Sequence, residues 1–206
     1  MASDLGVLAP FVAEFLRTYP LITMEIDVSV RTVDLVGENF DVALRVGVGP
    51  LKDDASLAAR PVLLLQGGLY AAPGYLKKRG LPRAPDGLFE HDAVHGLTKS
   101  GEPLRWSLQR GNVRWEGVPP ARVSTNSPEE VLRLAAEGAG IVLAVHATAK
   151  PYVRTGELTR VLPEWAFPPA TLWAVFPGRR LMPAKTRVFL DALKAKFDNP
   201  RVPAPQ

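Results

Sequence analysis

The chain of 206 residues contains no cysteine. This absence excludes disulfide bonds and thiolate metal ligands, and it is compatible with a reducing compartment. The three histidines do not have the spacing of a metal site either. His91 and His95 are four residues apart, but the sequence around them favours a loop and a strand rather than one helix. We therefore expect neither a metal ion nor a cofactor.

Long apolar runs are also absent, and none approaches the roughly 20 residues that a membrane-spanning helix requires. The first ten residues, MASDLGVLAP, lack the basic region of a signal peptide, and Pro10 and Glu14 interrupt the apolar stretch. We therefore expect a cytoplasmic protein with no membrane contact.

Catalytic signatures are missing. The sequence GAG at 138–140 closes a helix, whereas a dinucleotide-binding fingerprint opens one. Gly96 and Gly101 have the spacing of a P-loop, but Glu102 occupies the position of its lysine. No serine lies in a nucleophile elbow. We expect a binding protein, with an enzyme as the less favoured alternative.

A dense basic stripe is absent as well, although the net charge is +4. Residues 1–59 hold nine acidic and four basic side chains, whereas residues 60–206 hold 12 acidic and 21 basic ones. The basic residues of the second part are scattered singly. Because a nucleic-acid interface concentrates them, this pattern favours an ordinary solvated surface.

What is present is an alternation of helical and extended patterns in the first 70 residues. Ser3 or Asp4 can cap a helix that ends near Pro20, and residues 22–30 alternate as a strand does. A short helix is expected near 32–39 and a strand over 41–47. Alternating elements of this kind predict an α/β fold with parallel strand pairs.

The remaining sequence indicates a second lobe. A strand region over 61–73 contains Gly67 and Gly68, which suggest a bend. Residues 105–117 form a hairpin pattern whose turn is Gly111-Asn112. The chain is expected to leave the first lobe near residue 70 and to return near 174. This predicts one lobe of 1–70 with 175–206, a second lobe of 71–174, and hinges near Gly67-Gly68 and Thr171.

Helix-end chemistry is the strongest indication of a site. Ser127 and Glu130 form a capping box around Pro128, and the helix that they start ends at Gly138. Free amides at such a helix start favour an anion, although capping by Ser127 alone is the plainer interpretation. Arg45 interrupts an apolar strand at its carboxyl end. It is either a surface ion pair or a carboxylate-binding residue.

Six segments resemble, in order, the effector-binding domain of LysR-type transcriptional regulators. They are VAEFLRTYP, VDLVGENFDVALRVGVGPLKDDASLAARPV, YAAPGYL, HDAV, GAGIVLAV and GELTRVLPEW…LWAVFP. The resemblance covers about residues 3–197. It implies a type 2 periplasmic-binding-protein-like α/β fold, with two Rossmann-like lobes joined by a two-strand hinge. It also implies a ligand-sensing regulatory domain, and a solute-binding receptor of a transport system is the alternative function on the same fold.

The resemblance implies that a small effector, commonly an organic anion, binds between the lobes. The implied pocket residues come from both lobes: Ser29, Arg31, Arg45, Val46, Gly47, Thr98, Asn126, Ser127, Val145 and His146. Family members often carry proline at the position of His146.

Two parts of the family pattern have no counterpart in this sequence. They are the winged helix-turn-helix with its linker helix, and the strand that precedes the first helix. We therefore expect the chain to be a regulatory fragment that contacts DNA only through the missing N-terminal domain. The family also implies an antiparallel homodimer, or a tetramer of the full-length protein. The first helix is apolar on more than one face, and the expected interface residues are Leu8, Val12, Phe15 and Leu132.

Overall fold

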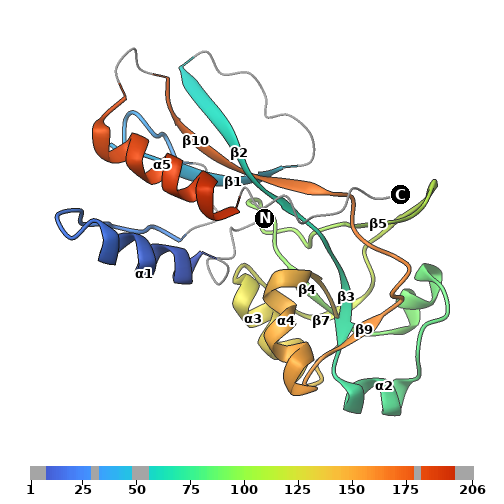
Figure 1. Ribbon diagram of the computed structural model, residues 1–206. Coiled ribbons are helices and arrows are strands. Elements are labelled where there is room, and N and C mark those ends of the chain that lie inside the picture. The colour runs from blue at the N-terminus through green and yellow to red at the C-terminus, as the bar shows by residue number, and fades with distance from the viewer. Residues whose placement is uncertain (1–7, 29–32, 48–55, 179–181, 198–206) are drawn as a thin grey trace. The chain divides into compact units, whose positions relative to one another are not determined.

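A computed structural model describes residues 8–28, 33–47, 56–178 and 182–197. The chain divides into two compact units, which Figure 1 shows. We call Leu65–Pro169 the central unit, and the described parts of Leu5–Leu64 and Ala170–Gln206 the terminal unit. The chain crosses between them at 64/65 and 169/170, slightly before the positions expected from the sequence.

The central unit contains a five-stranded sheet in the order β7-β4-β8-β3-β9. Strand β4 (Ala93–Gly96) runs parallel to both β7 (Ala121–Thr125) and β8 (Ile141–Val145). Strand β3 (Gly67–Ala71) runs antiparallel to β8 and to β9 (Thr159–Val161). The α/β fold is therefore confirmed, but the parallel pairs lie in the central unit, whereas they were predicted from the first 70 residues.

Both faces of this sheet are covered. Tyr70 of β3 belongs to an apolar cluster with residues of α3 (Pro128–Ala136) and α4 (His146–Thr155). Figure 1 shows these two helices side by side over the sheet. The preceding residue, Leu69, belongs to a second cluster on the opposite face. Successive side chains of a strand point to opposite faces, which explains why neighbours enter different clusters.

The second face is covered by shorter elements: α2 (Pro73–Arg79), a 3-10 helix η2 (Pro85–Glu90), and a hairpin of β5 (Trp106–Arg110) and β6 (Val113–Gly117). The hairpin has the expected register, with Leu108 opposite Trp115. Gly111 in its turn has φ 55°, a conformation that glycine adopts without strain.

The terminal unit contains a three-stranded sheet in the order β1-β10-β2, with β1 (Ala43–Gly47), β10 (Ala170–Pro177) and β2 (Leu57–Leu65). Strand β1 is antiparallel to β10. Helices α1 (Ala9–Thr18) and α5 (Ala184–Phe197) pack against each other through aromatic rings. Phe189 lies with its ring centroid 5.6 Å from that of Phe11 and 5.4 Å from that of Phe15.

The start of α1 differs from the expectation. The helix begins at Ala9, and no side chain caps it. Pro10 lies in its first turn, where the missing N–H costs nothing. The expected capping residues Ser3 and Asp4 lie outside the described residues.

The expected strand over 22–30 is not formed by residues 22–28, and residues 29–30 lie outside the described residues. Ile22 and Met24 are half-buried, but Ile26 and Val28 are 48% and 59% exposed. An alternating pattern becomes a strand only when a neighbour supplies a ladder of hydrogen bonds. Among the described residues no such neighbour lies beside this segment. The expected helix near 32–39 is likewise reduced to a turn at 35–39.

The bend expected at Gly67-Gly68 is not formed, because both glycines lie inside β3; the hinge expected near them stays a prediction. A Cβ on Gly67 would collide with the ring of Phe167 and the carbonyl of Ala144. A Cβ on Gly68 would collide with the guanidinium of Arg160. The glycines therefore permit close packing within the central unit, and the crossing lies just before them.

Candidate functional site

The parallel strands of the central unit end together at one edge of the sheet. Gly96 of β4 lies opposite Thr125 of β7, and Val94 of β4 lies opposite Val142 of β8. Ligands of α/β sheets bind beyond such carboxyl ends. The predicted residues of this unit lie at these ends or just beyond them: Thr98, Asn126, Ser127, Val145 and His146.

Thr98 is engaged in its own turn. Its hydroxyl accepts the Glu102 N–H at 3.1 Å and lies 2.9 Å from the hydroxyl of Ser100. Its N–H donates to the Glu102 carbonyl at 2.8 Å. The hydroxyl therefore has little hydrogen-bonding capacity left for a ligand.

The start of α3 offers fewer free amides than the sequence suggested. The Ser127 hydroxyl accepts the Glu130 N–H at 3.3 Å, and the Ser127 N–H donates to the Thr125 hydroxyl at 3.1 Å. The Val131 N–H donates to the Ser127 carbonyl at 3.1 Å, and Pro128 has no N–H. Capping by the chain itself therefore accounts for most of this helix start.

The charges near the start of α3 also disfavour an anion. Glu129 and Glu130 lie in the first turn and contact Arg133 at 2.7 and 3.6 Å. Glu129 is the main cause that raises the pKa of Arg133. The exposed side chain of Asn126 is the polar group that remains for a ligand here.

The start of α4 is better suited to an anion. This helix begins at His146 with Val145 at its N-cap; no side chain caps it, and its first turn has no acidic residue. The His146 N–H donates to the Gln66 carbonyl at 2.8 Å. The positive end of the helix dipole is therefore less compensated at α4 than at α3.

His146 is joined to the core of the sheet. Its Nδ1 lies 2.5 Å from the hydroxyl of Tyr70, a residue that is 3% exposed. Burial lowers the pKa of His146, and the positive charge of Arg160 lowers it further. Burial raises the pKa of Tyr70. Both pKa shifts favour the neutral forms of these two groups, which share this hydrogen bond.

Arg160 is the residue of this edge that the sequence reasoning missed. Its guanidinium lies 5.2 Å from the centre of the Tyr70 ring, and its Nη2 donates to the carbonyls of Pro163 and Trp165 at 3.3 and 3.1 Å. Its Nη1 is buried and has no hydrogen-bond partner among the described residues. The sequence feature that could have identified Arg160 is its place as an arginine between the apolar residues Leu158 and Val161.

The predicted residues of the terminal unit are only partly described. Ser29 and Arg31 lie outside the described residues, whereas Arg45, Val46 and Gly47 lie in β1. Arg45 stands inside the strand, opposite Trp173, and is half-buried. Its Nη2 donates to the carbonyl of Val33 at 3.4 Å. No carboxylate is paired with it among the described residues.

Three of the four expected dimer residues are buried within a single chain. Leu8 is 2% exposed, and Phe15 and Leu132 are each 3% exposed. Only Val12 is half-exposed. One lobe thus buries more of α1 than the sequence suggested, and Val12 is left for a contact with another chain.

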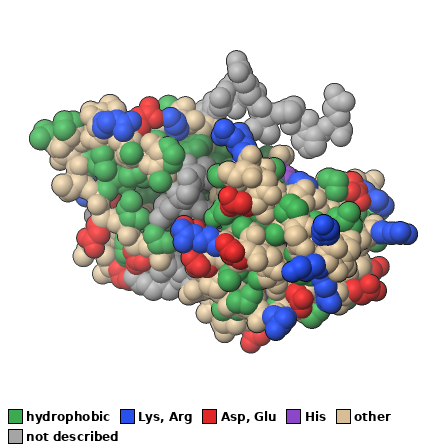
Figure 2. All heavy atoms as spheres, turned by 90° about the horizontal axis from the view of Figure 1, so that it is seen from below, with side chains coloured by type: hydrophobic (Ala, Val, Ile, Leu, Met, Phe, Trp, Pro, Cys, Tyr) green, Lys and Arg blue, Asp and Glu red, His purple; other side chains and the backbone are tan. Residues whose placement is uncertain are grey.

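Across the described ranges, no three histidine or acidic side chains converge to hold a metal ion. Over the same ranges, no helix combines the length and the apolar character needed to cross a bilayer. Figure 2 shows basic side chains interspersed with acidic ones on the visible face, in agreement with the scattered pattern of the sequence.

Comparison with known proteins identifies related regulators. The model of the LysR substrate binding domain matches residues 2–198. An HTH-type transcriptional regulator of Xanthomonas campestris pv. campestris is 35% identical over 202 residues, which are 95% of this chain and 57% of the relative. The transcriptional activator TtdR of Escherichia coli is 32% identical and covers 91% of this chain and 59% of its own length. The chain thus spans little more than half the length of these relatives.

Comparison with solved structures gives the same result as the sequence comparison. The regulatory domain of CrgA from Neisseria meningitidis, a LysR-type transcriptional regulator, has a TM-score of 0.80 at 28% identity and covers 94% of this chain and 93% of its own. The regulatory domain of AphB from Vibrio vulnificus has a TM-score of 0.78 at 27% identity and covers 94% of each chain. The type 2 periplasmic-binding-protein-like fold is thereby confirmed. The relatives are regulators, which agrees with the expectation of a binding domain and not with an enzyme or a transport receptor.

Proposed function

Because the chain belongs to the LysR substrate-binding domain family, we propose that it controls transcription by binding a small organic anion between its two units. In the longer protein, this binding acts on DNA through a winged helix-turn-helix domain. The protein works in the cytoplasm as a homodimer, or as a tetramer at full length.

The start of α4 is the observation that carries the choice of an anion. It combines an uncapped helix end without acidic residues and the guanidinium of Arg160, whose Nη1 has no partner in the described part of the chain. Arg160 is half-buried and has no carboxylate partner among the described residues, so its positive charge favours an anion at this edge. The neutral imidazole of His146 adds a second polar group at this edge.

The full effector site takes residues from both units. We propose that the central unit contributes Arg160, Asn126, Val145 and His146, and that Thr98 and Ser127 line the same edge with hydroxyls that local hydrogen bonds already engage. From the terminal unit we propose the residues that the resemblance implies: Ser29, Arg31, Arg45, Val46 and Gly47. Arg45 supports this role because it is a half-buried cation without a carboxylate partner among the described residues.

A thermal-shift screen of organic carboxylates and phosphates tests the proposal. At a concentration about 100 times Kd, an effector should stabilise the chain by about 2.7 kcal/mol and raise Tm by roughly 5–10 °C. Arg45→Ala, Asn126→Ala and Arg160→Gln should each weaken the shift. Arg154→Gln is the control, because Arg154 is an exposed arginine in the last turn of α4.

Two results would contradict the proposal. One is a hit that keeps its affinity in Arg45→Ala, Asn126→Ala and Arg160→Gln alike, which would place the binding site elsewhere. The other is a set of hits restricted to neutral or cationic compounds, which would exclude an anionic effector while leaving the family unchanged.

A further inference from the structure

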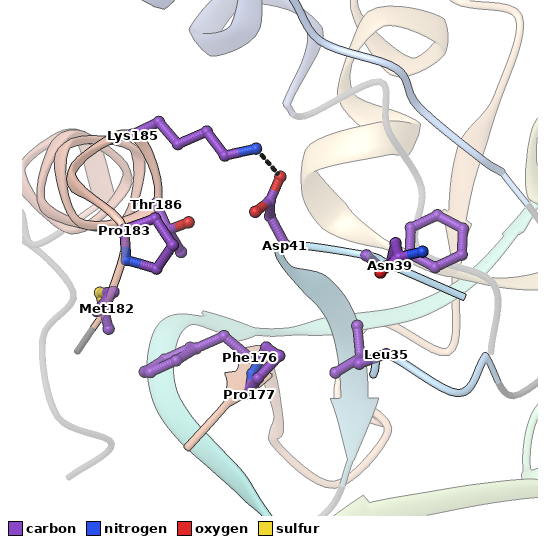
Figure 3. Close-up of a pocket in the computed structure, with 10 residues that line it drawn as sticks. Leu35, Asn39, Asp41, Phe176, Pro177, Met182, Pro183, Lys185 and Thr186 are labelled. Carbon is purple, nitrogen blue, oxygen red and sulfur yellow. Dashed lines mark hydrogen bonds and ion pairs between the residues drawn. The ribbon is translucent and has the colours of Figure 1, made fainter. Parts of the chain in front are cut away.

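The hairpin of the central unit has an unpaired edge, unlike the pocket of the terminal unit. In that pocket, which Figure 3 shows, the Lys185 Nζ lies 2.6 Å from the carboxylate of Asp41, so these charges already have partners. In the described part of the chain, β6 pairs only with β5, in a 2-stranded sheet. The other edge of β6 therefore offers backbone groups to a further strand.

The hydrogen bonds of β5 show which groups of β6 face this edge. The Gln109 N–H donates to the Ala166 carbonyl at 2.7 Å, and the Ala166 N–H donates to the Gln109 carbonyl at 3.1 Å. Both backbone groups of Gln109 thus point away from β6, so Gln109 and its neighbour Arg114 are a non-hydrogen-bonded pair. Because antiparallel ladders alternate, the N–H and C=O groups of Arg114 and Glu116 point outward from β6.

The side chains of β6 are divided between its two faces, as in any strand. Trp115 packs against the apolar core, and its ring centroid lies 5.9 Å from that of Phe89. Val113 lies on the same face and is 53% exposed. Arg114 and Glu116 are exposed on the opposite face, and neither forms an ion pair within the described ranges. Both the backbone and the charges of this edge are therefore available.

These charges fit a second copy of β6 in one register. If two copies run antiparallel about a twofold axis at Trp115, Arg114 of each copy lies opposite Glu116 of the other. The outward backbone groups of these residues then form hydrogen-bonded pairs. An axis at Arg114 would place two arginines opposite each other, and an axis at Glu116 two glutamates. Because like charges directly opposite destabilise a ladder, the register centred on Trp115 is favoured.

The apolar side chains fit the same register. Trp115 lies opposite Trp115 of the second copy in a non-hydrogen-bonded pair, where side chains approach most closely. Val113 lies opposite Gly117 of the second copy, which has no side chain. Within each chain the Trp115 ring lies over Gly117, since a Cβ there would collide with it. Val113 therefore gains an aromatic neighbour and loses contact with water.

We propose that β6 pairs with β6 of a second copy of this chain and joins the two hairpins into one continuous antiparallel sheet. The contact is weak, because a strand of five residues buries less surface than a stable interface, which buries about 1,200–2,000 Å². We expect a Kd in the millimolar range. The pairing therefore joins copies that other contacts already hold close together. It does not depend on the effector site or on the contact through α1.

Amide NMR spectra of the whole chain at tens of micromolar and at millimolar concentration test this proposal. The signals of Arg114 and Glu116 should shift with concentration. Those of Val113 and Trp115 should shift less, because their N–H groups face β5. The spectra also show whether each variant is folded.

Reversal of the charges tests the register. Arg114→Glu and Glu116→Arg should each weaken the pairing roughly tenfold or more, because each places like charges opposite one another in both symmetric pairs. An equimolar mixture of the two variants should restore the pairing, because Glu then lies opposite Arg in both pairs. Arg154→Glu is the matched control on the exposed surface of α4, and it should leave the pairing unchanged.

Two results would overturn the proposal. One is the absence of any concentration-dependent shift at Arg114 and Glu116 up to millimolar concentration. The other is a mixture of Arg114→Glu and Glu116→Arg that pairs no better than either variant alone, which would show that these residues do not lie opposite each other.

Discussion

Single hydroxyl groups at the strand ends serve either the fold or a ligand, and Ser127 serves the fold. Its side chain caps α3 by accepting the Glu130 N–H. Ser127→Ala should therefore lower the free energy of unfolding by about 1 kcal/mol, the usual value of such a cap. Urea denaturation measures this change. Ser124→Ala, on the exposed side of β7, is the matched control and should change stability much less.

If Ser127→Ala abolishes effector binding but leaves stability unchanged, the hydroxyl belongs to the ligand site and not to the cap. Such a result would contradict the capping role and would place the start of α3 in the effector site.

The buried His91 and the half-buried His146 make stability depend on pH. Burial is the main cause that lowers the pKa of both His146 and His91 below the ordinary value of 6.5. The unfolded chain therefore binds protons at a higher pH than the folded chain. Stability should be greatest above pH 6.5 and should fall as the pH drops below it through the folded-state pKa values.

Urea unfolding at pH 7.5 and at pH 5.5 measures this dependence. His146→Gln and His91→Gln should each reduce the loss of stability at the lower pH, because each removes one group that the unfolded state protonates first. Equal losses in the unmodified chain and in the double variant would show that other groups cause the pH dependence.

Residue types and spacing predicted some roles in the site better than others. The Ser127 cap was predictable because its partner is three residues away in the sequence. Arg160 was not, because its contacts with Tyr70 and Trp165 depend on how β9 and the following loop fold back. The engagement of Thr98 and Ser127 in local hydrogen bonds also required the structure, since a hydroxyl's partners do not follow from its position in the chain.

At the scale of elements, β3 depends on the absence of a side chain at Gly67. An added methyl group would collide with Phe167 and with the backbone of Ala144. Gly67→Ala should therefore lower the free energy of unfolding by about 1–3 kcal/mol, as overpacking does.

Gly74→Ala is the control for Gly67→Ala. Gly74 lies in α2, and a Cβ there would meet nothing within 4 Å. This substitution should stabilise the chain by about 0.5–1 kcal/mol, because glycine is a poor helix former. Chemical denaturation of both variants checks the pair. Equal effects would show that the packing around β3 adapts more than the structure suggests.

Elements with local signals were predicted well. The hairpin of β5 and β6, helix α3 and helix α5 follow from turn residues, a capping pattern and helical spacing. The strand predicted over residues 22–30 is not formed by residues 22–28. A strand requires a partner, and an alternating pattern does not say whether one is available. The glycines of β3 were interpreted as a bend because the sequence does not reveal the close approach of Phe167 and Arg160.

At the scale of the whole molecule, the charge distribution limits what the chain does alone. The chain has a net charge of +4, but its bases are scattered among acidic side chains, and the resemblance assigns DNA reading to a separate helix-turn-helix domain. We expect the purified chain to bind DNA only non-specifically, with an affinity that falls steeply as salt increases. Footprinting at two salt concentrations tests this. A salt-resistant, sequence-dependent footprint would contradict it.

The chain should also pair with itself through α1. Val12 is the half-exposed residue among the four expected at the interface, and the other three pack inside one chain. A specific dimer would bury on the order of 1,600 Å² in total, so a single charge at a contact in its centre is strongly unfavourable. Val12→Glu should convert the dimer to a monomer without unfolding either unit, because the side chain already reaches the surface.

Sedimentation at tens of micromolar, with circular dichroism on the same samples, measures the effect of Val12→Glu. Val113→Glu is the control, because Val113 is a 53% exposed valine on the hairpin of the central unit, away from α1 in the sequence. It should leave the dimer intact. If the unmodified chain is already a monomer, self-association does not belong to this part of the protein. If both variants remain dimeric, the interface exists but does not include this face of α1.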